Sequence, residues 1–311
     1  MTLPPLNKPV LSANLLLFKD FEEAAHAFDA AAIPFLALKG IVFARELYPR
    51  PDMRAMEDID LLIRPPDAYK ARRLLAELGY APKPDDPHAM RRGRTELDVE
   101  SGIWYLDKSG VEALWRRALT VEEDGSSFRS PSWEDHLIHV VAHCAVHHAA
   151  WDASDKEDLR RLLDLPLDYA AVARRLRRAR LGAAFTASLR ALKLKTPPEL
   201  ASALPAAGGI EERLFLSALS HGANTGLGHL LRLWTAPNRL HAVGRWLFPE
   251  RDFLRRRYMT EYPLLYLFFR PPHLLYRALR ALLSNGSDWI CDERNRAPRA
   301  EPPAPAASRI R

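Results

Sequence analysis

Two aspartates separated by one residue stand in a run that is otherwise apolar, DIDLLI at residues 58–63. On a β-strand the side chains alternate between the two faces, so Asp58 and Asp60 would point to the same side. Like charges beside so many apolar side chains are costly unless a cation holds them together. A third acid, Asp98, lies in the alternating segment TELDVE at 95–100, which predicts a neighbouring strand. The pattern predicts a divalent metal site that Mg²⁺, or alternatively Mn²⁺, would suit.

The same acids have an interpretation that needs no metal. Asp58 would then cap the end of a strand, and Asp60 would pair with Arg54 or Arg64. A bare Asp-x-Asp pattern is common, so the residues around it have to decide between the two interpretations.

A Lys-Gly corner follows the apolar run at 35–38 and precedes the acids. Gly40 would let backbone N–H groups at a helix N-terminus approach a phosphate, and Lys39 would add a point charge. The alternative is a tight turn with an exposed lysine. Arg54, in the loop before the acids, would either contact phosphate or pair with an aspartate, and the sequence leaves both open.

The elements that must position these residues follow from hydrophobic periodicity, prolines and glycines. The predicted strands cover 35–38, 58–63 and 95–100, and the predicted helices cover 12–32, 40–47, 68–78, 133–150, 156–164, 168–180, 183–194 and 210–219. Gly79 is expected to end the helix over 68–78, and Ser132 is expected to cap the N-terminus of the helix over 133–150. This order predicts an α/β (α+β) domain over 1–125, a helical domain over 126–290 and a disordered Pro/Ala-rich tail over 291–311.

The stretch from Phe35 to Tyr80 resembles the uncharacterised bacterial nucleotidyltransferase family of the DNA polymerase beta-type nucleotidyltransferase superfamily. The residues that carry the resemblance are Leu38-Lys39-Gly40, Tyr48, Arg54, Asp58-Ile59-Asp60-Leu61 and Leu75-x-x-x-Gly79-Tyr80. It implies a small polymerase-beta-type sheet with flanking helices, followed by a mostly helical domain on the acceptor side.

The resemblance also implies an activity and a set of site residues. A metal-dependent nucleotidyltransferase of this kind moves a nucleoside monophosphate from an NTP such as ATP to a hydroxyl-type acceptor. Asp58, Asp60 and Asp98 would be the catalytic metal ligands. The nucleotide-binding residues would be Lys39, Gly40 and Arg54.

The chain departs from the superfamily pattern in two places. Many members carry Gly-Ser at the corner, where this chain has Gly40-Ile41, and a non-catalytic nucleotide-binding or scaffold protein is therefore a second hypothesis. The family often follows its third acid with Leu-His, where this chain has Val99-Glu100. Glu96 and Glu100 consequently stay open as alternatives to Asp98.

Histidines recur along the predicted helix over 133–150. His136, His139, His143 and His147 follow at offsets of three and four, which places them along one helix face, and His148 is adjacent. Imidazoles four residues apart could share Zn²⁺, so a zinc hydrolase is a third hypothesis. The resemblance implies a His-containing helix after the catalytic domain, with one or two of these histidines facing the cleft. His143 is the candidate for proton transfer because it is central. Packing of the helix on the α/β domain is the alternative.

Composition limits the partners without identifying them. The net charge of +6 comes from arginine-rich helices such as ARRLRRAR. We interpret these helices as having a solvated basic face rather than a surface that binds nucleic acid. The aromatic and basic segment 262–283 would pack on the core or lie on an anionic membrane surface. The chain has two cysteines, no signal-peptide pattern and no apolar run long enough to span a bilayer. These features favour a location in the reducing cytoplasm. The acceptor, the preferred base and the oligomeric state are not fixed by the sequence.

Overall fold

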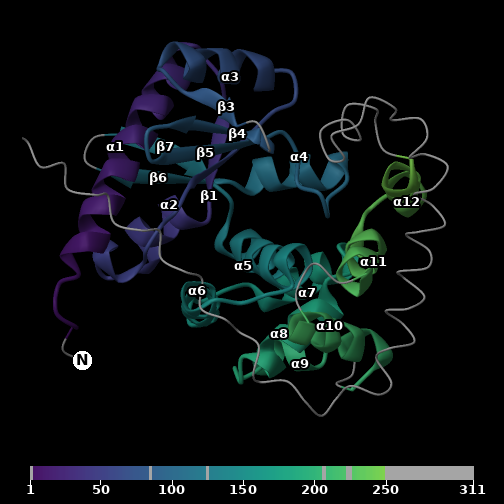
Figure 1. The fold of residues 1–311 in the computed structure, drawn as a ribbon. Coiled ribbons are helices and arrows are strands. Elements are labelled where there is room, and N and C mark those ends of the chain that lie inside the picture. The colour runs from purple at the N-terminus through teal and green to yellow at the C-terminus, as the bar shows by residue number, and fades with distance from the viewer. Residues whose placement is uncertain (1–2, 84–85, 124–125, 205–207, 222–225, 249–311) are drawn as a thin grey trace, which may run out of the picture.

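The computed structural model of this 311-residue chain describes residues 3–83, 86–123, 126–204, 208–221 and 226–248. Figure 1 shows a sheet with its helices in one half of the molecule and a group of helices in the other. The predicted tail at 291–311 and the segment 262–283 lie outside the described residues.

A five-stranded mixed sheet forms the first half, in the order β1-β2-β5-β4-β3. The strands are β1 (Phe35–Leu38), β2 (Ile59–Ile63), β3 (Ala81–Lys83), β4 (Asp86–Arg92) and β5 (Thr95–Glu100). Strands β2 and β5 run parallel, whereas the other neighbours pair antiparallel. Strands β1 and β2 are buried along their whole length; β1 is apolar throughout, and β2 is apolar except for Asp60.

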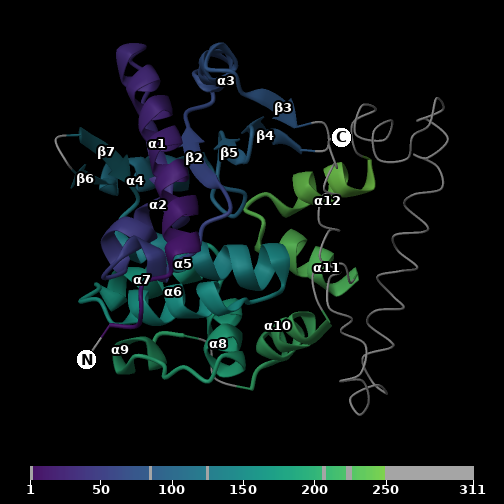
Figure 2. The ribbon, with the colours of Figure 1, turned by 60° about the vertical axis from the view of Figure 1, so that its left-hand side comes forward.

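Helices flank this sheet. Helix α1 (Lys8–Ala30) begins after Asn7, whose side chain accepts a hydrogen bond from the Val10 N–H, and α3 (Ala68–Glu77) links β2 to the β3–β4 hairpin. Figures 1 and 2 show α1 running beside the sheet. Gly79 follows α3 with a φ of +89°, the left-handed conformation in which glycine commonly ends a helix.

Two short helical segments follow β1. Helix α2 (Gly40–Val42) continues as a π-helix over Phe43–Leu47, and a 3₁₀ turn covers Pro51–Met53. The predicted helix over 40–47 therefore exists with a wider second turn. After the sheet come α4 (Lys108–Arg117) and a two-stranded hairpin, β6 (Leu119–Glu123) and β7 (Ser126–Ser130).

The described chain from Trp133 onward is helical. Ser132 caps α5 as predicted, because its hydroxyl accepts from the Asp135 N–H at 3.3 Å. The helices are α5 (Trp133–Val141) with a π-helical continuation over Ala142–His148, α6 (Ala153–Leu163), α7 (Tyr169–Arg178), α8 (Gly182–Ala191), α9 (Pro198–Ala201), α10 (Ile210–His221), α11 (Gly226–Thr235) and α12 (Arg239–Leu247).

One cluster of buried apolar side chains runs through both halves of the fold. It includes Phe21 of α1, Leu61 of β2, Val141 of α5 and Phe185 of α8. The predicted division at 125/126 falls between two strands that pair with each other, and the change to helices comes after Ser130. The three-part division of the chain stays a prediction.

The fold class is confirmed, with corrections in detail. The α/β arrangement of a small mixed sheet with flanking helices, followed by a mostly helical part, is present. Strands β3 and β4 are absent from the predicted strands, and β4 forms because it finds a partner in β5. Within the described ranges no helix is long and apolar enough to cross a bilayer.

Candidate metal and nucleotide site

The parallel pairing of β2 with β5 brings the predicted acids together. Asp60 and Asp98 are direct partners in the register of the two strands, and Asp58 precedes β2 by one residue. One carboxylate oxygen from each acid lies within 4.8 Å of the others. The alternation on β2 and the register with β5 therefore turn three acids that are separated in sequence into one cluster.

The electrostatics of this cluster fit a cation. Burial, together with the negative charge of Asp60, raises the pKa of Asp58 to about 7, although the ammonium of Lys39 opposes the shift. Burial and repulsion from Asp60 raise the pKa of Asp98 to about 6. The Oδ1 atom of Asp98 is buried and has no hydrogen-bond partner in the described part of the chain. A buried, unpartnered carboxylate oxygen beside two further carboxylates is a suitable donor set for a hard divalent ion.

The neighbouring glutamates do not join the cluster. Glu96 accepts from the Lys83 ammonium at 2.8 Å, and Glu100 stands opposite Leu62 in the register of β2 with β5. Of the three acids left open on this strand, Asp98 is the one that the pairing brings beside Asp60.

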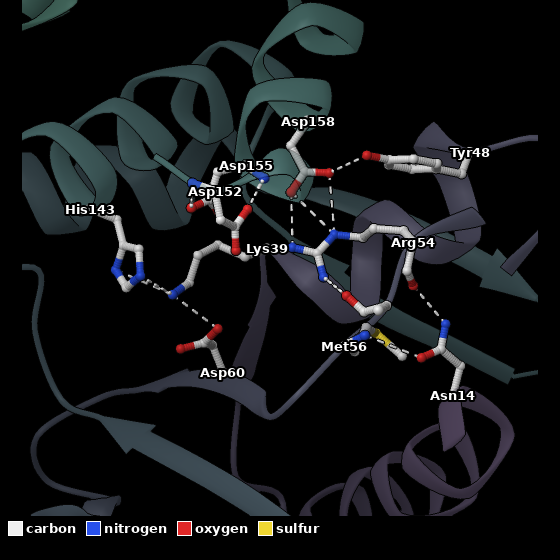
Figure 3. Close-up of polar contacts among 11 residues, drawn as sticks. Asn14, Lys39, Tyr48, Arg54, Met56, Asp60, His143, Asp152, Asp155 and Asp158 are labelled. Atoms are coloured by element: carbon white, nitrogen blue, oxygen red, sulfur yellow. Dashed lines mark hydrogen bonds and ion pairs between the residues drawn. The ribbon is translucent and has the colours of Figure 1, made fainter. Parts of the chain in front are cut away.

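Lys39 lies directly beside the acids. It follows β1, whose last residue pairs with Asp60, and its φ of +44° is rare for a residue with a side chain. Its Nζ is 3.1 Å from Asp60 Oδ2 and 3.4 Å from His143 Nδ1 (Figure 3). Burial works to lower the pKa of Lys39, but Asp60 and Asp58 together raise it, so the side chain stays charged. The alternative of an exposed lysine is wrong, because only 14 % of this side chain is exposed.

Gly40 is buried at the start of α2, under the guanidinium of Arg54. A Cβ atom on Gly40 would come within 2.9 Å of Arg54 Nη1. The absence of a side chain at Gly40 therefore leaves room for the guanidinium of Arg54. The hydroxyl that many related enzymes carry at the next position is replaced by Ile41, which is fully buried.

Arg54 pairs with an acid from the helical half of the fold. Its Nε and Nη2 atoms donate to Asp158 of α6, with an Nη2–Oδ2 distance of 2.8 Å, and Nη1 donates to the Ala55 carbonyl at 3.0 Å. Tyr48 donates from its hydroxyl to the same Asp158 at 2.7 Å (Figure 3). The sequence left two roles open for Arg54, contact with phosphate and pairing with an aspartate, and the structure shows the pairing with Asp158. The metal-free interpretation of Asp60 is not observed, because its ion-pair partner is Lys39 and Arg64 pairs with Glu112.

Asn14 and Asp158 are the residues that the sequence analysis missed. Asn14 is buried on α1; its Nδ2 donates to the carbonyls of Pro51 and Arg54, both at 2.7 Å, and its Oδ1 accepts from the Met56 N–H at 3.2 Å. These contacts hold the loop that leads to Asp58. No local pattern identifies either residue, because their partners are more than 35 residues away in sequence.

The histidines divide into two groups. His136 is fully buried with Nε2 at 2.7 Å from the Ser130 hydroxyl, and His139 lies 3.3 Å from the Tyr105 hydroxyl. The packing alternative therefore holds for these two. His143, predicted as the central candidate, reaches Lys39, while His147 and His148 lie farther along the same helix.

Known proteins place this geometry in context. Residues 7–204, more than half of the chain, match the family described as uncharacterised nucleotidyltransferase. Among curated proteins no sequence matches the chain. A solution structure of the antibiotic-resistance factor ANT(2'')-Ia is similar, with 20% identity, a TM-score of 0.43 and coverage of 58% of this chain and 96% of that one. A crystal structure of an antigenic nucleotidyltransferase-like protein from Paracoccidioides brasiliensis has 16% identity and a TM-score of 0.35, and covers 70% of this chain and 90% of that one. On the strength of the family match, this chain belongs to the uncharacterised nucleotidyltransferase family.

Proposed function

We propose that this protein transfers a nucleoside monophosphate from an NTP to a hydroxyl-type acceptor, with Mg²⁺ or Mn²⁺ bound by Asp58, Asp60 and Asp98. The observation that carries the proposal is the meeting of these three carboxylates, within 4.8 Å of one another, in a chain of a nucleotidyltransferase family. Three carboxylates can hold two divalent ions about 3.5–4 Å apart.

The reaction follows from the chemistry of the groups. The acceptor oxygen forms a bond to the α-phosphorus of the NTP, and the bond from that phosphorus to the pyrophosphate oxygen breaks. Bound divalent ions would lower the pKa of the acceptor hydroxyl and offset the charge on the pyrophosphate. Asp98, the partner of Asp60 in the sheet register, would complete the metal site and accept the hydroxyl proton.

Lys39 and Gly40 would hold the triphosphate. If a metal ion bound Asp60, the Lys39 ammonium would leave that carboxylate and pair instead with the negatively charged phosphate oxygens of the NTP. Arg54 would act as a positioning residue, because its donors are occupied by Asp158 and by the Ala55 carbonyl. The helical part, which reaches Lys39 through His143, would close one side of the cleft and select the acceptor.

Pyrophosphate release from mixed NTPs in the presence of Mg²⁺ tests the proposal. Labelled NTPs incubated with cell extract would identify the acceptor at the same time. Asp60→Asn keeps the shape of the side chain and should lower turnover by at least about 100-fold, since metal stabilisation of transition-state charge is worth several kcal/mol. Asp29→Asn, an exposed acid at the end of α1, is the matched control and should leave turnover unchanged. Equal turnover in wild type and Asp60→Asn would remove the mechanism.

A second candidate is a protein that binds a nucleotide without consuming it. Ile41 stands where a phosphate-binding hydroxyl would be, and this motivates the alternative. NTP binding that depends on Lys39, with no labelled product across extracts and purified acceptors, would favour binding over turnover.

A further inference from the structure

Three histidines gather on the π-helical turn at Ala142–His148. A π-helix pairs residues five apart, so side chains four and five positions apart share one face. His143, His147 and His148 have that spacing, and one ring nitrogen from each lies within 4.8 Å of the others. The ring centroids of His143 and His148 are 4.3 Å apart, those of His147 and His148 4.8 Å, and those of His143 and His147 5.7 Å.

We propose that these three histidines form a site for a transition-metal ion of the Zn²⁺ class, separate from the carboxylate site. Imidazole nitrogens are ligands that Zn²⁺ prefers, whereas the carboxylate cluster suits a hard ion such as Mg²⁺. Two nitrogens bound to one tetrahedral Zn²⁺ would be about 3.3 Å apart, so small rotations of the rings would complete the site. The inference does not depend on the proposed transferase activity.

Hydrogen bonding separates His147 and His148 from the other three histidines of this helix, of which His143 contacts Lys39. His136 and His139 have hydroxyl partners in Ser130 and Tyr105. In the described ranges, by contrast, the imidazoles of His147 and His148 have ring contacts and no hydrogen bond. His148 is exposed, which leaves the cluster open to an ion from solvent.

Nearby charges bear on which ligand the cluster takes. Lys39 Nζ is 3.4 Å from His143 Nδ1, and Arg232 Nη2 donates to the carbonyl of His147 at 2.5 Å. These cations weaken a metal site and would strengthen an anion site. The Lys39 charge, however, is paired with Asp60 at 3.1 Å, and the Arg232 contact is with the backbone rather than with an imidazole. We therefore favour the metal ion, and a phosphate-type anion is the competing outcome.

Three protein ligands leave one position of a tetrahedral ion open, as in catalytic zinc sites. Because His143 contacts the lysine that pairs with Asp60, the ion would lie on the helical side of the carboxylate site. A water molecule or a donor atom of the acceptor could occupy it.

Titration of the metal-free, untagged chain with Co²⁺ and then with competing Zn²⁺ tests the site. The visible absorption of Co²⁺ reports tetrahedral nitrogen ligation, and Zn²⁺ should displace it at one equivalent per chain. His148→Ala removes an exposed ligand and should weaken Zn²⁺ binding by at least about 100-fold, since loss of even an outer-shell partner typically costs 10–100-fold. His26→Ala, an exposed histidine on α1, is the matched control and should bind Zn²⁺ as wild type does.

Two further measurements separate this site from the carboxylate site and from an anion site. Asp98→Asn, which leaves the Lys39–Asp60 pair intact, should lose Mn²⁺ binding and keep Zn²⁺ binding, whereas His148→Ala should do the reverse. Zn²⁺ affinity that is the same in wild type and His148→Ala, or that falls only in Asp98→Asn, would overturn the proposal. Binding of inorganic pyrophosphate that is lost in His148→Ala, with Zn²⁺ binding unaffected, would overturn it in favour of the anion. The circular dichroism of His148→Ala and His26→Ala should match that of wild type, because both histidines are exposed.

Discussion

Lys39→Met should tighten the binding of Mn²⁺ to the nucleotide-free protein. The Lys39 ammonium is 3.1 Å from Asp60 Oδ2, and only 14 % of the lysine side chain and 11 % of the aspartate side chain are exposed. A divalent ion at Asp60 must displace this ammonium or bind beside a like charge. Removal of the ammonium removes that competition.

The size of the effect follows from the contact that a metal ion must break. A hydrogen bond to a charged group contributes about 1.5–3 kcal/mol. A factor of ten in a binding constant corresponds to about 1.4 kcal/mol, so Lys39→Met should tighten Mn²⁺ binding by about 10- to 100-fold. The same substitution removes a phosphate contact in the proposed mechanism, so it should weaken NTP binding.

Protonation of the acids sets the conditions of this experiment. Lys39 opposes the upward shift in the pKa of Asp58, and without it this carboxyl would hold its proton to a higher pH. Protons would then compete with the ion near neutral pH, so calorimetric titration with Mn²⁺ is best done at about pH 8, above the pKa of about 7 that Asp58 has beside Lys39.

Two control variants make the result specific. Lys39→Arg retains the charge and should not tighten Mn²⁺ binding, and Lys108→Met removes an exposed lysine at the start of α4 and should have no effect. If Lys39→Met binds Mn²⁺ with unchanged or lower affinity at about pH 8, the ammonium does not compete with the ion, and our reasoning about this contact is refuted.

Three further predictions concern the surroundings of the acids. Asp158→Asn leaves the Arg54 guanidinium buried without its anion, which should lower the free energy of unfolding by about 3 kcal/mol in chemical denaturation; a loss below about 1 kcal/mol would show that the pair contributes little. Because the pKa of Asp58 is raised to about 7 and that of Asp98 to about 6, both acids lose protons as the pH rises. Mn²⁺ affinity should therefore increase between about pH 5 and pH 8. A Mn²⁺ affinity that does not change with pH would contradict the clustering of these acids. The metal-free protein should lose folding stability as the pH rises from about 4 to 7, since raised carboxyl pKa values favour the folded state only while the acids are protonated. Gly40→Ala places a Cβ 2.9 Å from Arg54 Nη1 and should lower turnover about tenfold with a small change in melting temperature, whereas equal turnover would show that the guanidinium can move freely.

The parts of the fold that the sequence predicts are those with a strong local pattern. Strands 35–38 and 95–100 coincide with β1 and β5, because a continuous apolar run and a strict alternation identify them. Strand β4, DPHAMRR, has neither pattern, and it exists because the edge of β5 supplies hydrogen bonds. The π-helical turns at 43–47 and 142–148 were not predictable from a 3.6-residue period.

The candidate site shows the same limit. Asp58, Asp60 and Asp98 could be proposed together because spacing and strand pairing follow from short segments. The partner of Arg54 could not, since Asp158 is 104 residues away and belongs to a helix whose pattern indicates only an amphipathic surface. Long-range partners depend on how the helices pack against one another, and the sequence of a single segment does not predict that packing.

Two contacts connect the helical part to the carboxylate cluster, and they act on different sides of it. Asp158 of α6 holds Arg54, whose loop leads to Asp58, and His143 contacts Lys39, which pairs with Asp60 (Figure 3). The first contact fixes the loop that leads to Asp58, and the second touches the ammonium that the proposed metal ion would displace from Asp60. A change in the helical part, such as the binding of the proposed acceptor, would therefore reach the carboxylate cluster through Lys39 while Arg54 keeps the loop before Asp58 in place.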